Sequence, residues 1–294
     1  MIEYNDMIGQ FSLITKINQL LENKTFPRFS IFTGAKGSGK DLIAYNIANE
    51  LTEIVVSVGS KVDSIREMIQ STYKLSEPCT YIISNADNMS LAAKNALLKV
   101  TEEPPNNAYF IMTLRDENQT LETIRSRGTI FHTDLYTPAE IKKFALDNVK
   151  YNQIQYIQLF QDLCSTPGDV EQLASYDILD FYDYVCLVFN NIDKVSGANA
   201  FKIGNRINFK DDSDKFDLQL FWRAFIHLAM EQCRTIIQNG TTISEVVEDF
   251  KVYLQWVRIT QRYLQELNIG GINKAATFDS WLLEIREVRI DEDS

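Results

Sequence analysis

The chain has 294 residues, of which 45% are hydrophobic and 23% charged, and its formal net charge is -11 at pH 7. This length is too great for one ordinary core and fits two or three small domains. The acidic balance argues against a protein that grips nucleic acid alone through a broad basic surface. No apolar run approaches the ~18 residues of a membrane helix and the start shows no secretion signal, so we expect a cytoplasmic protein.

Between residues 12 and 136, short β-rich runs alternate with amphipathic segments. Strands are predicted at 29–33, 53–58, 80–84, 109–114 and 129–135. Several of these runs are apolar throughout, as expected for a sheet that is covered on both faces. Helices are predicted between them at 41–51, 62–73 and 90–103, the last with Ser90 as its N-cap. The alternation indicates an α/β domain with a mainly parallel sheet.

The segment after the first predicted strand reads GAKGSGKD, from Gly34 to Asp41. It matches the phosphate-binding pattern G-x-x-x-x-G-K-[ST] except at Asp41, where the pattern requires a hydroxyl. In a working loop, backbone N–H groups surround the phosphates, the lysine meets the β/γ oxygens and the hydroxyl ligates Mg²⁺. The candidate nucleotide-binding residues are Gly34, Lys36, Gly37, Gly39, Lys40 and Asp41.

With Asp41 in place, two interpretations of this loop are equally well supported. A carboxylate beside the triphosphate weakens binding unless it takes the metal ion directly. The segment is therefore either a nucleotide site with an altered metal ligand or a glycine-rich turn that holds no ligand. The loop by itself does not decide between them.

The pattern changes at Thr137, where TPAEIKKFALDN begins like a capped helix with proline in its first turn. From there on, apolar residues recur at three- and four-residue spacing, and strand signals nearly disappear. A short helical unit over 137–178 contains a turn, STPGD, at 165–169. A longer helical region follows, interrupted by a predicted loop at 195–214. Its main helices are predicted at 217–238, 243–267 and 273–289, which suggests a helical bundle.

Aromatic and sulfur side chains are better explained by packing than by ligand binding. Three tryptophans fall within apolar helical stripes, so we expect them in the core rather than stacked on bases: Trp222, Trp256 and Trp281. The four cysteines are far apart and form no C-x-x-C pair, which favours free buried thiols over structural zinc. These cysteines are Cys79, Cys164, Cys186 and Cys233. We predict no metal site.

The segment from the third predicted strand onward is the most distinctive in the chain. YIISNADNMSLAAKNALLKVTEEPP, at 81–105, resembles the hhhhDEADxMxxxAxNALLKxLEEPP segment of AAA+ clamp-loader subunits. TIRSRG, at 123–128, resembles their S-R-C motif. The similarity spans roughly 7–175 and is greatest to delta-prime subunits of the bacterial DNA polymerase III clamp loader, or a phage counterpart. It implies an AAA+ P-loop core over 1–136, a helical lid over 137–178 and a helical collar over 179–294.

The sequence departs from the resembling ATPase subunits where hydrolysis needs it most. Ser84 stands at the metal-binding Asp position and Asn85 at the catalytic Glu position, although Asp87 is kept. Asparagine can orient water but cannot take its proton, and serine is a weak Mg²⁺ ligand. Glu171 occupies the place of the lid arginine that senses the γ-phosphate in this family. With Asp41, these are four concerted losses, so we predict that the chain does not hydrolyse ATP.

Other family positions are kept or carry less information. Arg127 corresponds to the arginine finger, which in this family reaches the γ-phosphate held by a neighbouring subunit; the alternative is a surface arginine paired with an acid such as Glu122. Gly128 stands where the family usually has Cys, which we interpret as a neutral packing change. Lys94 is the candidate for a DNA phosphate contact, although a lone lysine is more often a solvated helix residue. The four-cysteine zinc module usual in bacterial relatives is absent.

The sequence thus predicts a non-hydrolysing clamp-loader subunit of the delta-prime type in a hetero-oligomeric ring. The implied partners are other AAA+ clamp-loader subunits, a sliding clamp and primer-template DNA, with no membrane, in the cytoplasm of a bacterial cell or phage-infected host. ATP or ADP bound without hydrolysis stays open. Two alternatives are an active ATPase that uses Asp41 at the metal, and a nucleotide-free AAA+ scaffold of another replication or repair assembly.

Overall fold

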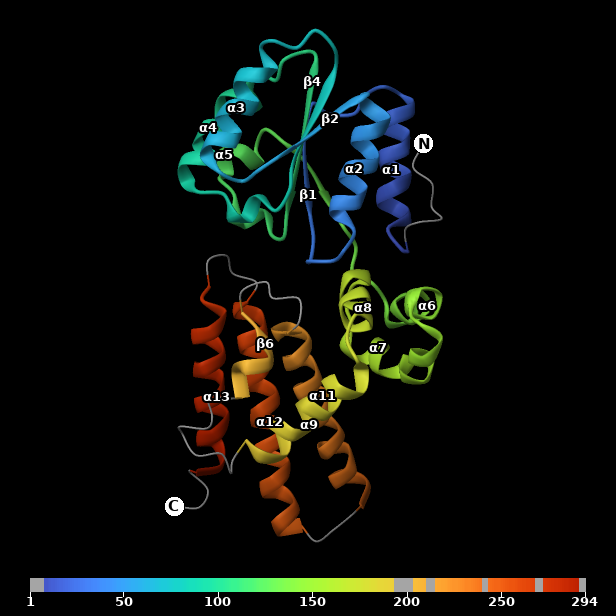
Figure 1. Cartoon of the computed structure of the whole chain (residues 1–294), viewed down its shortest axis with the longest axis vertical. Helices are drawn as coiled ribbons and strands as arrows, with labels where there is room; N and C mark the ends of the chain where they lie inside the picture. Colours follow the sequence, from blue (N-terminus) through green and yellow to red (C-terminus); the bar gives the residue numbers. More distant parts are fainter. Residues whose placement is uncertain (1–7, 193–202, 210–214, 240–242, 268–271, 291–294) are drawn as a thin grey trace. The chain divides into compact units, whose positions relative to one another are not determined.

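The computed structural model describes residues 8–192, 203–209, 215–239, 243–267 and 272–290 (Figure 1). The chain forms two compact units, which are described separately. The first comprises the chain up to Phe144 together with Ser165–Gly168, and the second comprises Ala145–Cys164 and the chain from Asp169 onward. The division into three domains at 136 and 178 stays a prediction.

The first unit is built on a five-stranded sheet in which every neighbouring pair of strands is parallel. The strands lie in the order β2-β3-β4-β1-β5. Their bounds are β1 (Phe29–Thr33), β2 (Ile54–Val58), β3 (Cys79–Ile83), β4 (Ala108–Leu114) and β5 (Thr129–His132). All five predicted strands form, but β5 ends earlier than predicted. Asp134 leaves the sheet because its N–H and carbonyl both bond to the side-chain amide of Gln10, at 2.8 Å each.

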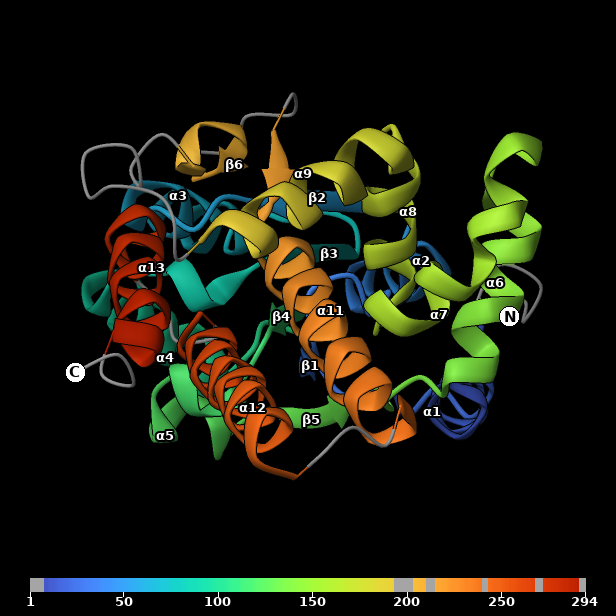
Figure 2. The same cartoon turned by 90° about the horizontal axis from the view of Figure 1, so that it is seen from below.

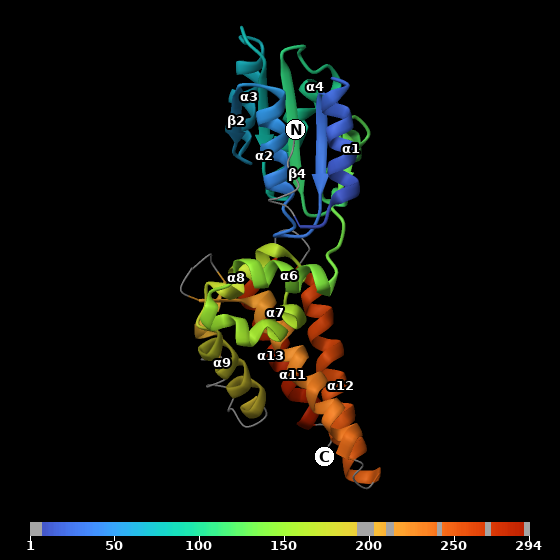
Figure 3. The ribbon, with the colours of Figure 1, turned by 90° about the vertical axis from the view of Figure 1, so that its right-hand side faces the viewer.

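Helices cover both faces of this sheet, as Figures 1 and 3 show. One face carries α1 (Phe11–Glu22) and α2 (Lys40–Leu51); the other carries α3 (Val62–Thr72), α4 (Leu91–Glu102) and α5 (Glu122–Arg125). Because side chains alternate along a strand, Ile82 packs with α1 and α2, whereas Tyr81 and Ile83 pack with α3 and α4. Both faces are therefore apolar, which explains the nearly continuous hydrophobic runs in the sequence.

Helix α1 was not among the predicted elements, although its buried residues Leu13, Ile14 and Ile17 follow helical spacing. The predicted cap of α4 is confirmed, since Ser90 Oγ accepts a hydrogen bond from the N–H of Ala93 at 3.2 Å. Two short 3-10 turns follow strands at the same edge of the sheet: η2 (Ala86–Asn88) after β3 and η3 (Glu117–Gln119) after β4.

The second unit is helical. Helix α6 (Pro138–Asn148) begins in the first unit, and Thr137 and Glu140 cap it reciprocally. The other elements are η4 (Tyr151–Tyr156), α7 (Ile157–Leu163), α8 (Pro167–Ala174), α9 (Ile178–Asn191), η5 (Gly204–Arg206), α11 (Leu218–Asn239), α12 (Ile243–Glu266) and α13 (Lys274–Ile290). Helix α12 packs against both α11 and α13 (Figure 2). The bundle predicted from the apolar spacing is confirmed.

The three tryptophans lie in the core of this bundle, as predicted, and each is at most 1% exposed. The indole N–H of Trp281 donates to Thr260 Oγ1 at 3.0 Å, and that of Trp256 donates to the carbonyl of Ile285 at 3.0 Å. Thr260 in turn donates to the carbonyl of Trp256 at 2.7 Å. The indole N–H groups of Trp256 and Trp281 thus have hydrogen-bond acceptors, which offsets the free-energy cost of burying them.

Two predicted irregular segments contain more regular structure than expected. Pro167 already begins α8, so only Ser165 and Thr166 of the predicted turn precede a helix; proline suits a first helical turn because it lacks an N–H. Within the predicted loop at 195–214, the described residues include η5 and a two-residue strand β6 (Ile207–Asn208). It pairs with β7 (Phe216–Asp217) because Ile207 and Phe216 are both buried. Residues 195–202 and 210–214 of that loop lie outside the described residues.

The cysteines are free, and Cys79, Cys164 and Cys233 are buried while Cys186 is half-buried. Burial raises the pKa of each of the four thiols, so these groups are protonated at neutral pH. Across the part of the chain that the structure describes, no helix is long and apolar enough to cross a membrane.

Candidate functional site

The phosphate-binding loop joins β1 to α2 at the carboxyl edge of the sheet. Gly37 and Gly39 have φ angles of 77° and 82°, in the left-handed region where glycine is favoured. Gly34 is required for another reason, because a Cβ there would lie 1.8 Å from Thr133 Oγ1. The glycine pattern that suggested a phosphate cradle is thus also demanded by the packing of the loop.

Lys40 is turned onto its own loop. The side chain is 2% exposed, and Nζ donates to the carbonyl of Ala35 at 3.2 Å. Asp41 Oδ2 lies 3.8 Å from the same ammonium. Burial lowers the pKa of Lys40 from its usual 10.5, although the charges of Asp41 and Asp87 oppose this effect. The ammonium that meets phosphate oxygens in a working loop is here bonded to a carbonyl of its own loop and lies beside the Asp41 carboxylate.

Asp41 connects α2 to the neighbouring strands. Its Oδ1 accepts a hydrogen bond from the hydroxyl of Thr113 at 2.7 Å, and Thr113 Oγ1 accepts one from the backbone N–H of Asn85 at 3.0 Å. Thr113 is fully buried in β4. Sequence reasoning missed this partner because Thr113 lies 72 residues from Asp41 in the chain; a hydroxyl within the apolar run AYFIMTL was the available signal.

The positions after β3 bring no uncommitted carboxylate to the loop. Ser84 is half-buried, and Asn85 is exposed with a left-handed backbone at φ 51°. Asp87, the acid that the sequence keeps, accepts the backbone N–H of Arg115 with both oxygens, at 2.8 and 3.0 Å. It therefore shapes the turn after β4.

These observations decide how well magnesium and a nucleoside triphosphate fit the loop. Ser38 Oγ is buried and has no hydrogen-bond partner within the described part of the chain, so one polar atom could still meet a phosphate oxygen. The metal positions fit poorly, because neither Ser84 nor Asn85 supplies a carboxylate, and Asp41 has only Oδ2 left beside the oxygen that binds Thr113. No hydrolytic step can be derived for this site.

Arg127 lies at the opposite edge of the sheet. It precedes β5, whose first residue pairs with Ser30 near the start of β1, whereas the loop follows the last residue of β1. The guanidinium donates to the carbonyl of Thr123 and, at 2.7 Å, to Glu102 Oε1. Its side chain is 31% exposed. The partner is thus Glu102 rather than Glu122, which had been the expected acid for a surface arginine.

Gly128 is not the neutral packing change that the sequence suggested. A Cβ at this position would lie 2.8 Å from Ile31 Cδ1 and 2.9 Å from Phe29 Cε1. Both neighbours are buried core residues of β1, so a larger side chain has no room without displacing them. Glycine here lets the segment that carries Arg127 approach the sheet closely.

Lys94 and Glu171 complete the predicted site residues, and the structure brings neither to the loop through a described contact. The Lys94 ammonium, on α4, donates to the backbone carbonyl of Gln119. This contact ties α4 to the segment after β4. Glu171 is exposed on α8 in the second unit. The roles predicted for these residues toward DNA and the lid stay predictions.

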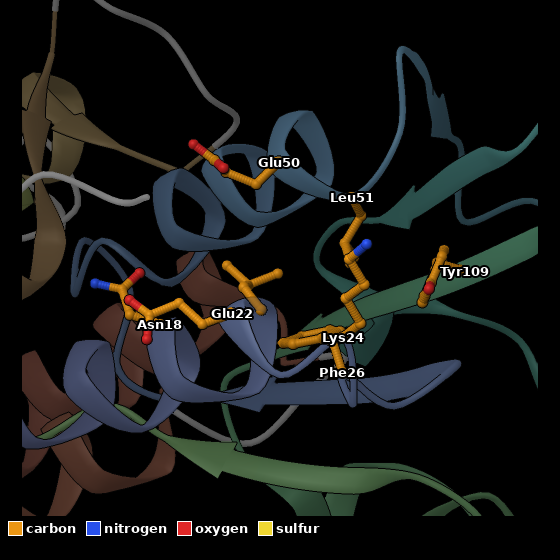
Figure 4. Close-up of a pocket in the computed structure, with 8 residues that line it drawn as sticks. Asn18, Glu22, Lys24, Phe26, Glu50, Leu51 and Tyr109 are labelled. Atoms are coloured by element: carbon orange, nitrogen blue, oxygen red, sulfur yellow. The ribbon is translucent and has the colours of Figure 1, made fainter.

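A cavity of about 400 Å³ opens at the amino edge of the sheet (Figure 4). It lies between the last turns of α1 and α2 and the start of β4, and its lining residues are Asn18, Leu21, Glu22, Lys24, Phe26, Glu50, Leu51 and Tyr109. None of them belongs to the predicted site. Among the residues that the structure describes, no three His, Cys, Asp or Glu side chains gather as metal ligands.

Comparison with known proteins points to replication proteins. A family described as "DNA polymerase III, delta subunit" matches residues 57–135, which include β3, β4 and β5 and the last two residues of β2. The replication factor C small subunit of Methanosphaera stadtmanae is 26% identical over 207 residues, covering 60% of this chain and 64% of the relative. The DNA polymerase III subunit tau of Bacillus subtilis is 23% identical, covering 97% of this chain and 54% of the relative.

Among solved structures, a variant of RuvB from Thermotoga maritima matches with a TM-score of 0.50 and 18% identity, covering 82% of this chain and 80% of that chain. At this identity the likeness concerns the fold. The chain spans between 44% and 64% of the length of the first curated relatives it matches. The fold is α/β of the AAA+ type with a helical C-terminal region, and the matches support an AAA+ clamp-loader family without singling out the delta-prime type.

Proposed function

We propose that this chain is a non-hydrolysing clamp-loader subunit of the delta-prime type. It joins other AAA+ subunits in a ring, in the cytoplasm of a bacterial cell or phage-infected host, and donates Arg127 to ATP held by its neighbour. The ring then opens a sliding clamp and places it on primed DNA. The similarity to clamp-loader subunits supports the general role, and the site geometry supports the specific one.

One observation carries this proposal: the residues for hydrolysis and the arginine are at opposite edges of one sheet. The four-residue strand β5 follows Arg127 toward the carboxyl edge, and at ~3.3 Å per residue it spans about 13 Å. An arginine side chain does not bridge that distance to the loop of its own chain. Arg127 can therefore meet a γ-phosphate only if another subunit supplies it.

The state of the loop agrees with this division of labour. Thr113 binds Asp41 and the Ala35 carbonyl binds Lys40, so the groups that would act on a triphosphate are engaged within the chain. Phosphoryl transfer depends almost wholly on positioning and charge stabilisation. A site without metal ligands or a water-activating carboxylate supplies neither.

The bonds that hold Arg127 are easily exchanged. Its ion pair with Glu102 is exposed, since the Glu102 side chain is 51% accessible, and such surface pairs contribute only ~0–1 kcal/mol. An arginine finger that meets a transferring phosphoryl group accelerates the reaction by ~10³ to 10⁵. Breaking the pair with Glu102 therefore costs little compared with the stabilisation that an arginine finger gives to the transition state at the neighbour's site.

The decisive experiment reconstitutes the complete ring with Arg127→Ala. We expect hydrolysis at the neighbouring site to fall by ~10³ or more, and clamp loading to fall with it. The matched control is Arg125→Ala, at the last residue of α5 and two residues before Arg127, because the guanidinium of Arg125 donates to Asn118 Oδ1 of its own chain at 2.8 Å. Unchanged clamp loading and unchanged DNA-stimulated hydrolysis with Arg127→Ala would show that the proposal is wrong.

A titration of the isolated chain with ATP and Mg²⁺ separates the alternatives. We expect no turnover, with or without weak binding. Turnover that disappears in Lys40→Ala would instead establish the active ATPase that uses Asp41 at the metal. Failure to co-purify with a sliding clamp and a second AAA+ subunit would favour a nucleotide-free scaffold of another assembly.

A further inference from the structure

Three consecutive carbonyls of the phosphate-binding loop accept hydrogen bonds from segments distant in the sequence. The carbonyl of Lys36 accepts from Thr166 Oγ1 at 3.2 Å, and that of Gly37 accepts from the N–H of Gly168 at 3.1 Å. The carbonyl of Ser38 accepts from the hydroxyl of Tyr136 at 2.8 Å. All six residues belong to the first unit.

The contact between Gly37 and Gly168 is a direct approach of two backbones. A Cβ on Gly168 would lie 2.5 Å from Gly37 Cα, and a Cβ on Gly37 would lie 2.8 Å from Gly168 Cα. Real Cβ atoms do not come that close to backbone, so only glycine fits on either side. The backbone of Gly168 therefore lies directly against the backbone of Gly37, and the Thr166 hydroxyl contacts the loop beside it.

Tyr136 is fixed as firmly on the other side. Its ring lies against Gly9, where a Cβ would come within 3.3 Å of the aromatic edge. The preceding Asp134 is held by both groups of the Gln10 side-chain amide, and Thr133 N–H donates to the carbonyl of Thr33 at 2.9 Å. Thr133 and Asp134 are thus anchored to the first unit just before Tyr136, so the Tyr136 hydroxyl meets the loop at a fixed place.

We infer that the segments 133–136 and 165–168 hold the loop in its folded form in place of a nucleotide, with Tyr136, Thr166 and Gly168 as the positioning residues. A glycine-rich loop loses much conformational entropy when it becomes ordered, and in an ATPase the bound phosphates offset that loss. Here hydrogen bonds to the loop's carbonyls do so. The inference deepens the proposed function, on which it rests, because it gives a role to a loop that does not hydrolyse ATP.

Hydrogen exchange of the full-length chain, followed by mass spectrometry with and without ATP or ADP, tests this inference. We expect slow exchange across 36–42 and 165–170 without nucleotide, and less than about a twofold change when nucleotide is added. Tyr136→Phe removes one donor and should speed exchange of the loop roughly threefold to tenfold. Tyr151→Phe, at a side chain that is 92% exposed, is the matched control and should change nothing.

Gly168→Ala is the stronger variant, because its Cβ cannot lie beside Gly37 Cα; we expect at least about a tenfold acceleration across 36–42. Gly59→Ala is its control, since the nearest atom there is the movable Oγ of Ser64 at 3.3 Å. Fast exchange of the wild-type loop that slows only when nucleotide is added would overturn the inference, as would no response to either Tyr136→Phe or Gly168→Ala. These outcomes concern the isolated chain, so they are distinct from the Arg127→Ala result in the ring.

Discussion

The two edges of the parallel sheet treat their charged groups differently. At the carboxyl edge, Lys40, Asp41 and Asp87 are all engaged within the chain, by a loop carbonyl, a threonine hydroxyl and a backbone N–H. At the amino edge, Arg127 also has two partners within the chain, the carbonyl of Thr123 and the carboxylate of Glu102, but the second contact is an exposed ion pair. A motif's residue types therefore do not reveal its activity: what matters is which partners the fold gives these residues and how easily those partners are exchanged.

After the loss of hydrolysis expected for Arg127→Ala, the largest effect is expected for Gly128→Ala, which changes the packing next to Arg127. Its Cβ would press on Ile31 and Phe29, so the free energy of unfolding should fall by about 1–3 kcal/mol. Urea unfolding measures the change. Gly59→Ala serves as the control, with a loss below that of Gly128→Ala because only a movable side chain is near. Equal stability of both variants would mean that the amino edge is packed more loosely than the structure shows.

Asp41→Thr should partly restore nucleotide binding by the loop at the carboxyl edge. It replaces a negative charge near the phosphate cradle by the hydroxyl that the loop pattern requires, so affinity for Mg²⁺ and a non-hydrolysable ATP analogue should rise roughly tenfold. Calorimetric titration measures the dissociation constants. Asp41→Asn removes the charge without supplying the hydroxyl and separates the two causes. Binding that is no tighter in either variant would show that Asp41 is not what weakens the site.

Glu102→Gln, at the amino edge, should have a smaller effect, which is on ATP hydrolysis by the ring. It frees Arg127 from its ion pair within the chain, so hydrolysis by the reconstituted ring should rise, by up to about fivefold, since an exposed pair contributes at most ~1 kcal/mol. Steady-state ATP hydrolysis measures this change. Glu103→Gln, at the adjacent residue, is the control. A fall in hydrolysis would indicate that Glu102 positions Arg127 for its neighbour instead of holding it back.

The smallest effect is expected for Lys40→Met. Burial lowers the pKa of Lys40, so the ammonium opposes folding below its folded-state pKa, and this cost disappears as the pH rises toward the unfolded value of 10.5. Methionine should therefore leave the free energy of unfolding unchanged or raise it by about 1 kcal/mol at neutral pH. Paired melting curves from pH 7 to 10 measure the difference, which should shrink with rising pH. A loss of stability would show that the bond to Ala35 outweighs burial of the charge.

Much of the fold follows from local patterns in the sequence. All five strands were predicted because runs such as CTYII are apolar on both faces, and α4 was predicted with its cap because Ser90 precedes a helical apolar spacing. Helix α1 and the strands β6 and β7 were missed. The apolar residues of α1 follow a helical spacing, so this helix could have been predicted. The strands β6 and β7 are only two residues long, and their pairing accompanies the burial of Ile207 and Phe216, which no local pattern indicates.

The sequence by itself determined which residue types stand at the predicted site: Ser84 and Asn85 follow β3, and folding does not turn a hydroxyl or an amide into a carboxylate. Tertiary structure decided what the remaining groups do. Only the order and direction of the strands separate Arg127 from the loop, and only long-range packing brings Thr113 to Asp41 and Gly168 to Gly37. Residue type is a local property, whereas a hydrogen-bond partner a hundred residues away depends on how the whole domain is assembled.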